Sequence, residues 1–356
     1  MGGPADPPGG TPEGSPSGAE DEYRSVVFDE SFVRAARLQE YSARERMTDH
    51  TPAVRRRPTL RGGLPRQALF LVLLIALAFA TAVYLGVRSP YRAPLAQPPA
   101  EELRTTVVPL APRGRVPGAA DPAALYAHSP AARFATGANG IPLPEHRGTA
   151  HFTDGQVTEA LLRAKEYIVA SSLDPAVLDG TDTGTVRSLL DAGQLDQFDR
   201  SLAHPAADGR HALTGWLVRL DTGRVRLADP EIRVRGTLRA TESDPAALEV
   251  TADPVLVYAL QPARSAAAAP ASLFTVRREL RFRFDQDDLR LHRLQLATAT
   301  VQAGPLACAE DPSGRFRPLL AGQGAPAGGP PGTDPYAPGG TAAVCGSLAP
   351  GAQPAV

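Results

Sequence analysis

The residues in this sequence that could do chemistry are few, and the two cysteines come first. Cys308 and Cys345 are the only cysteines among 356 residues. No CxxC pair or third ligand accompanies them, which argues against a zinc site. A bond between them would close a loop of roughly 38 residues and stabilise the fold by about 4 kcal/mol. We therefore predict a Cys308–Cys345 disulfide, with two unrelated free thiols as the alternative.

Arg278 is the second candidate, because it interrupts an apolar pattern. In the segment SLFTVRRELRFRF, Phe274, Val276, Leu280 and the two later phenylalanines share one phase of a strand. Arg278 falls on that same phase. Either a bulge turns it outward, or it points into the domain, where a buried guanidinium would need a carboxylate partner. The inward placement makes Arg278 a candidate ligand-pocket residue.

Catalytic motifs are otherwise absent. The chain has no GxxxxGK[ST], SxxK, GxSxG, HExxH or GxGxxG, and its only lysine, Lys165, lies within a helical pattern. No remaining histidine or aspartate has a visible partner at catalytic or metal-ligand spacing. We interpret the following as loop, surface and turn residues: His146, His151, His204, His211, Asp285, Asp287 and Asp288. The sequence therefore predicts a non-enzymatic protein with no cofactor and no metal.

Arginines line one face of the strands predicted after residue 230. Such a face could receive an anionic polymer or an acidic partner. Residues 231–303 hold ten Arg against nine acids, however, and this balance favours a mixed, solvated face with cross-strand ion pairs. The formal net charge of −1 excludes a globally basic nucleic-acid binder. The arginines concerned are Arg233, Arg235, Arg239, Arg277, Arg281, Arg283 and Arg290.

The elements that would position these residues change type near His204. Thr153 and Gln156 fit a capping box ahead of a helix, and a second helical stretch covers 184–202. After His204 the apolar period becomes two, which predicts antiparallel strands, with a hairpin turn at 285–288 and a bulge near His292. We expect an α+β domain of N-terminal helices packed on a curved antiparallel sheet. The pattern resembles the nuclear-transport-factor-2-like and cystatin-like cone, and a small β-barrel with helices docked outside is the alternative.

An uncharged apolar run, ALFLVLLIALAFATAVYLGV, occupies residues 68–87. Its length suits a bilayer core, and five Arg before it against two after it predict a cytoplasmic N-terminus. A cleaved signal peptide is the alternative, although 67 residues precede the run. We thus expect a single-pass cell-membrane protein that contacts membrane lipids.

The expected organisation follows from this transmembrane helix. Residues 1–67 would be a mostly disordered cytoplasmic tail with a short docking helix near 29–47. Residues 88–150 would be a Pro-rich stalk and 151–318 an extracytoplasmic domain. Residues 319–356 would be a Gly/Pro-rich tail that the disulfide ties back.

Several stretches resemble a family of single-pass membrane proteins from Streptomyces and related actinomycetes. They are DEYRSVVFDESFVRAARLQEYSARER, FTDGQVTEALLRAKEYIVASSLDP, LDQFDRSL, SLFTVRRELRFRF and TDPYAPGG. The resemblance implies lineage and architecture but no activity. With the missing catalytic motifs, it leads us to expect a cell-envelope interaction protein with protein partners in the envelope and the cytoplasm. An extracytoplasmic module that binds a small or lipid-like ligand is the alternative, and an enzyme with a cone-type pocket ranks last.

Overall fold

The computed structural model describes residues 66–88, 100–264, 269–326, 331–337 and 344–355. The chain divides into two compact units, Met1–Arg92 and Ala93–Val356, which are treated separately below. The predicted cytoplasmic tail, including the helix expected near 29–47, lies outside the described residues.

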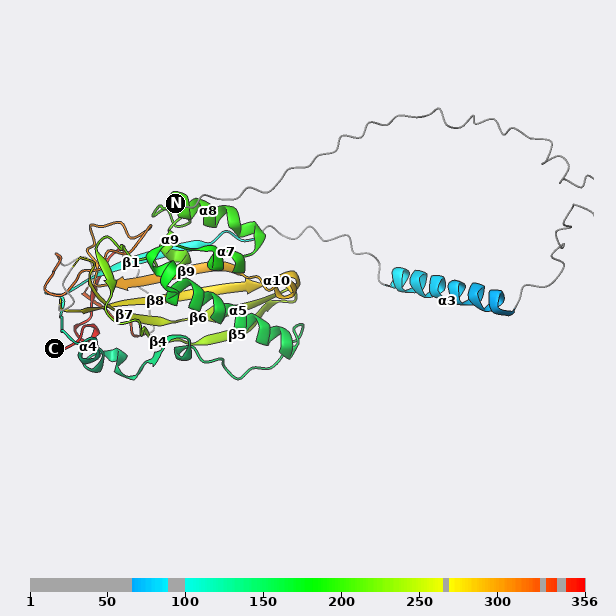
Figure 1. Cartoon of the computed structure of the whole chain (residues 1–356), viewed down its shortest axis with the longest axis horizontal. Coiled ribbons are helices and arrows are strands. Elements are labelled where there is room, and N and C mark those ends of the chain that lie inside the picture. Colours follow the sequence, from blue (N-terminus) through cyan, green and yellow to red (C-terminus); the bar gives the residue numbers. More distant parts are fainter. Residues whose placement is uncertain (1–65, 89–99, 265–268, 327–330, 338–343, 356) are drawn as a thin grey trace, which may run out of the picture. The chain divides into compact units, whose positions relative to one another are not determined.

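In the first unit, α3 (Arg66–Arg88) covers the apolar run (Figure 1). Within the described part of the chain, no helix combines the length and the apolarity that a membrane crossing requires. The prediction of a single-pass transmembrane helix over 68–87 is therefore contradicted.

The second unit is a mixed α/β domain built on one large, mostly antiparallel sheet. The main strand order is β10-β11-β1-β9-β8-β7-β4-β2, while β3 pairs with β7, and β6 pairs with both β5 and β8. The strands are β1 (Arg104–Ala111), β2 (Ala135–Thr136), β3 (Val225–Leu227), β4 (Arg233–Arg235), β5 (Leu238–Asp244), β6 (Ala247–Ala252), β7 (Val255–Pro262), β8 (Ser272–Phe284), β9 (Gln295–Gly304), β10 (Pro331–Thr333) and β11 (Gly346–Leu348).

Strand β8 is the centre of this sheet, because it is long enough to pair with three others. Along one edge it pairs with β9, and along the other it pairs first with β7 and then with β6. The change of partner falls at Pro254, which has no N–H for a ladder. The Arg278 N–H donates to the Pro254 carbonyl at 3.0 Å and bridges the break.

Helices cover one face of the sheet (Figure 1). The Thr153 capping box is confirmed: the Gln156 N–H donates to Thr153 Oγ1 at 3.3 Å, and the Thr153 N–H donates to Gln156 Oε1 at 2.9 Å. Together these bonds satisfy two of the first-turn donors. The α-helices are α4 (Pro122–Ala127), α5 (Asp154–Leu173), α6 (Pro175–Asp179), α7 (Gly184–Leu189), α8 (Leu195–Ala203), α9 (Leu213–Trp216) and α10 (Gln286–Leu291).

The two faces of β8 carry different cores. Its even-numbered residues, such as Phe274 and Phe282, pack with Tyr167 and Ile168 of α5 in the main core. Its odd-numbered Leu273 packs with Tyr126 of α4 in a smaller cluster on the other face. The alternation read from the sequence is thus confirmed, since successive strand residues point to opposite faces.

The cone prediction is corrected by the strands that join this sheet. Residues 104–111, expected in the stalk, form β1 and pair in parallel with β9. Residues 331–333 and 346–348, expected in the loose C-terminal tail, form β10 and β11, and these also pair in parallel. The physical reason is burial: Leu103, Val108, Leu110 and Leu348 are almost fully enclosed and require the sheet as a partner.

The turn after β8 also differs from the prediction. Residues 286–291 form the short helix α10, with Asp285 at its N-cap, in place of a hairpin turn. His292 ends it in the left-handed conformation at φ 56°. The register slip lies within the β8–β9 ladder, where Arg281 pairs with Thr298 and Phe282 with Leu296, so Ala297 is the extra residue. The period of two after His204 also predicts a strand through the alternating Trp216, Val218 and Leu220, but Trp216 ends α9 and Leu220 makes only one isolated bridge.

The α10 cap predicts a pH dependence of stability. Burial, opposed in part by hydrogen bonding, and the nearby Asp285 and Asp191 raise the pKa of Asp288 to about 7. Because this pKa lies above that of an unfolded aspartate, the stabilisation is full below about pH 4 and is lost as pH rises through about 7. We expect the free energy of unfolding to fall by about 4 kcal/mol across that window. Urea titrations at several pH values would measure this, and Asp288→Asn should flatten the slope; an unchanged slope in that variant would contradict the assignment.

Candidate functional site

Arg278 points inward, as one of the two predicted placements required, but it does not meet a carboxylate. Its side chain is 0% exposed. One terminal nitrogen donates to the hydroxyls of Ser171 and Ser172, both at 2.7 Å. The other donates to the carbonyls of Gly215 and Trp216, at 2.9 and 2.7 Å. The expected carboxylate partner is thus replaced by four neutral oxygens from α5 and α9.

The surroundings of Arg278 make it a structural residue. Burial lowers the pKa of its guanidinium, because desolvation disfavours the charged form. Tyr167 lies beside it and donates its own hydroxyl to the Trp216 carbonyl at 2.8 Å. With no exposed surface and its terminal nitrogens engaged by the protein, Arg278 joins α5 and α9 to β8 and offers no face to a ligand.

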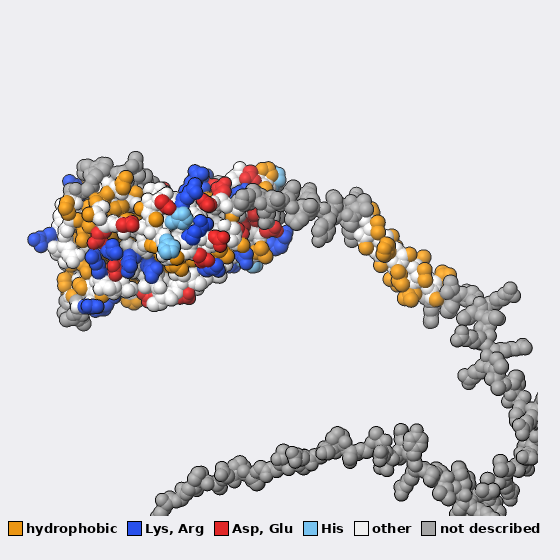
Figure 2. Space-filling model, turned by 90° about the horizontal axis from the view of Figure 1, so that it is seen from above, with side chains coloured by type: hydrophobic (Ala, Val, Ile, Leu, Met, Phe, Trp, Pro, Cys, Tyr) orange, Lys and Arg blue, Asp and Glu red, His pale blue; other side chains and the backbone are white. Residues whose placement is uncertain are grey.

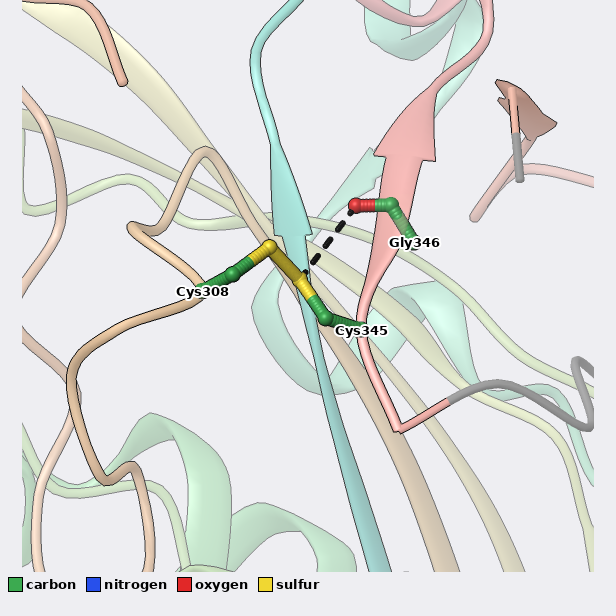
Figure 3. Close-up of a disulfide and its surroundings, with 3 residues drawn as sticks. All are labelled: Cys308, Cys345 and Gly346. Atoms are coloured by element: carbon green, nitrogen blue, oxygen red, sulfur yellow. Dashed lines mark hydrogen bonds between the residues drawn. A yellow bond between two sulfur atoms is a disulfide. The ribbon is translucent and has the colours of Figure 1, made fainter. Parts of the chain in front are cut away.

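The predicted disulfide is present: Cys308 and Cys345 are bonded (Figure 3). It links the segment that follows β9 to the residue that precedes β11. The Cys345 sulfur also contacts the Gly346 carbonyl at 3.6 Å. The bond therefore fastens the C-terminal strands to the sheet beside β1.

The histidines and aspartates singled out in the sequence are dispersed. His151 pairs with Glu242 and His211 with Asp208, each at 2.6 Å, while His146 contacts Thr158 at 2.7 Å. Asp285 and Asp288 cap α10. Over the described ranges, no three His, Cys, Asp or Glu residues gather in a way that could hold a metal ion. These groups stabilise local structure and do not assemble into one site.

A polar site forms on the sheet face opposite α5, where α4 and the smaller cluster leave part of β5, β6, β8 and β9 uncovered. We call this area the open face. It contains a hollow of about 540 Å³. Its lining residues are hydroxyl-bearing and charged, apart from Ala252 and Leu280: Thr237, Arg239, Thr251, Asp253, Arg277, Glu279, Arg281, Thr298 and Thr300.

Strand register places three arginines of this face in one line. Arg239 pairs with Thr251, Thr251 with Arg281, and Arg281 with Thr298. Thr298 in turn pairs with Arg104 of β1. Paired residues share a face, so this line reads Arg, Thr, Arg, Thr, Arg across five strands. Neighbouring strands lie about 4.8 Å apart, so successive arginines of the line are about 10 Å apart.

Three of the five charged residues that line the hollow, namely Asp253, Arg277 and Glu279, form ion pairs with one another. The Arg277 side chain is 3% exposed and binds both oxygens of Asp253, each at 2.7 Å, and Glu279 at 2.9 Å. It also donates to the Ala337 carbonyl. Hydrogen bonding to Asp253 raises the pKa of this guanidinium. Arg277 therefore holds the 334–337 segment against the sheet and is not available to a ligand.

The three arginines of the line are more accessible than Arg277. Arg281 has a 54% exposed side chain and reaches Glu249 only at 3.5 Å. Arg104 and Arg239 are exposed, and neither makes an ion pair or a side-chain hydrogen bond with any described residue. The ion pairs expected for a mixed face are thus present at Arg277, Arg281 and Arg283, but two guanidinium groups are unneutralised.

Elsewhere on the domain surface, basic and acidic side chains are interspersed in the view of Figure 2.

Sequence reasoning found Arg239 and Arg281 but missed Arg104, because its segment reads as a stalk. The signal that could have revealed β1 is the apolar run VVPLA immediately after Arg104 and two threonines.

The chain matches no protein-family model, no curated protein and no solved structure.

Proposed function

We propose that this protein is a non-enzymatic binding protein whose open face holds an extended acidic polysaccharide. The observation that carries the proposal is the line of three arginines in register, of which Arg104 and Arg239 form no ion pair among the described residues. Exposed guanidinium groups without a partner bind carboxylates and phosphates through charge-assisted hydrogen bonds.

The residues between the arginines favour a carbohydrate. Thr251 and Thr298 alternate with them along the line, and Thr237 and Thr300 flank it. Threonine hydroxyls both donate and accept, which matches sugar hydroxyls. A single-stranded nucleic acid would require aromatic side chains for base stacking, and none lines this hollow. A chain carrying one carboxylate at intervals of about 10 Å would meet each arginine of the line in turn.

The disulfide supports a location outside the reducing cytoplasm, since such bonds persist in oxidising compartments. The proposal therefore keeps the expected extracytoplasmic setting for the folded domain and the expected absence of catalysis.

The test is titration calorimetry of the full chain with oligosaccharides of hyaluronan and of polygalacturonate, with neutral dextran as a blank. The double variant Arg104→Gln/Arg239→Gln should bind at least tenfold more weakly, because it removes two exposed charges without removing an internal ion pair. The affinity of the unaltered chain should also fall as salt is raised.

The matched control is Arg133→Gln/Arg315→Gln, which removes two other exposed arginines that lie outside the hollow. This control should bind like the unaltered chain. Equal losses in both double variants, no binding of either acidic oligosaccharide, or tighter binding of single-stranded DNA would each contradict the proposed function.

A further inference from the structure

The outer edge of β1 has a gap in its hydrogen bonding. In a parallel pair, alternate residues turn their backbone groups toward and away from the neighbouring strand. The Thr105 N–H donates to Gly209 at 2.8 Å, outside the β1–β9 pair, so odd-numbered residues of β1 face away from β9. Pro109 is one of them, and its missing N–H therefore costs no ladder bond.

The gap lies between two partners that cover only the ends of this edge. Strand β11 pairs with Leu110 and Ala111 alone, and Gly209 takes the Thr105 N–H. The N–H and carbonyl of Val107 and the carbonyl of Thr105 lie between them. Among the described residues these three backbone groups have no hydrogen-bond partner.

A groove of about 480 Å³ opens onto this gap. One wall is β1 itself, from Thr105 to Pro109. The other walls come from the loop before α9 and from the segment after Cys308, beside the disulfide of Figure 3. Their lining residues are Ala207, Gly209, Ala212, Cys308, Glu310, Pro312, Ser313 and Val344.

Two buried side-chain oxygens in this groove also lack partners. Thr105 is 6% exposed, and its hydroxyl makes no hydrogen bond. Glu310 accepts from Arg224 at 2.9 Å through one oxygen, while its other oxygen is buried and unpartnered. Buried polar atoms left unsatisfied destabilise a fold, so a ligand that supplies hydrogen-bond donors here would relieve that penalty.

We propose that this groove binds an extended peptide carrying a lysine or arginine, which adds as a short strand to β1. The peptide's N–H groups would donate to the carbonyls of Thr105 and Val107, and one of its carbonyls would accept from the Val107 N–H. Its cationic side chain would reach Glu310, the only ionisable group among the described residues that line the groove. Backbone pairing supplies the affinity in such complexes, and the side-chain pocket supplies the specificity.

This site is independent of the open face, because it uses the edge and not the surface of the sheet. The two proposals can therefore fail separately, and a variant of one serves as a control for the other.

The experiment selects heptapeptides from a displayed random library against the full chain and measures their affinity as acetylated amides. Selected sequences should be enriched in Lys and Arg. Val107→Pro should bind them at least tenfold more weakly than Val107→Ile, because only the first removes the N–H that faces the groove. Glu310→Gln should bind at least fivefold more weakly and should lose the preference for Lys over norleucine in the peptide.

The Arg104→Gln/Arg239→Gln variant should bind the peptides as the unaltered chain does. Recovery of no binding peptide, equal affinity of the two Val107 variants in the folded state, or an unchanged Lys preference in Glu310→Gln would overturn the proposal. Since Glu310→Gln replaces one carboxylate oxygen with an amide nitrogen and leaves β1 intact, it remains informative if Val107→Pro does not fold.

Discussion

Arg278→Met is expected to lower the free energy of unfolding by about 3–5 kcal/mol, because breaking a buried charged network leaves its partners unsatisfied. The change would orphan the hydroxyls of Ser171 and Ser172 and the Gly215 carbonyl, while the Trp216 carbonyl keeps its bond from Tyr167. Relief of the buried guanidinium's desolvation offsets part of this loss. Urea unfolding of the full chain would measure it, with the single tryptophan, Trp216, as a buried fluorescent reporter.

The matched control is Arg281→Met, which removes an arginine from the same strand but from the open face. We expect it to change stability by less than about 1 kcal/mol, since exposed ion pairs contribute little. An Arg278→Met protein as stable as the unaltered chain would show that the four acceptors find other donors. The assignment of Arg278 as the link between α5, α9 and β8 would then be wrong.

Removal of the disulfide is expected to cost about 4 kcal/mol. Cys308 and Cys345 are 37 positions apart, and closing a loop of that size restricts the unfolded chain by about this amount in the chain-entropy model. The variant Cys308→Ser/Cys345→Ser should therefore unfold at a clearly lower urea concentration. Its slope against urea should be slightly larger, because the unlinked chain exposes more surface on unfolding.

Reduction provides the internal control for this prediction. Dithiothreitol should lower the stability of the unaltered chain to that of the double serine variant and should leave the variant itself unchanged. If the reduced chain kept its full stability, the covalent link would not be what fastens β10 and β11 to the sheet.

The two proposed binding surfaces share strand β1, and this shared strand suggests how the domain is used. Arg104 contributes to the line of arginines on the open face, while Val107, three residues later, presents the unpaired edge. A change that displaced β1 as a whole should weaken both activities together. Substitutions confined to Arg239 or to Glu310 should separate them.

The amino-acid sequence by itself determined the local features of this protein. The Thr153 capping box and the alternation along β8 each depend on residues within a few positions of one another. The sequence also indicated the pairing of Cys308 with Cys345, because the chain offers only one combination. The two-residue period of a strand also predicted correctly that Arg278 shares the phase of the apolar residues.

Only the tertiary structure decided which residues and strands these features contact. The oxygens bound to Arg278 come from residues as far as 107 positions away, and β1 pairs with a strand nearly 200 positions later. Periodicity reports which face of an element is apolar, but not which other element covers it. The stalk prediction failed for this reason: the prolines around β1 read as extended chain, and extended chain becomes a strand only when a partner such as β9 supplies its hydrogen bonds.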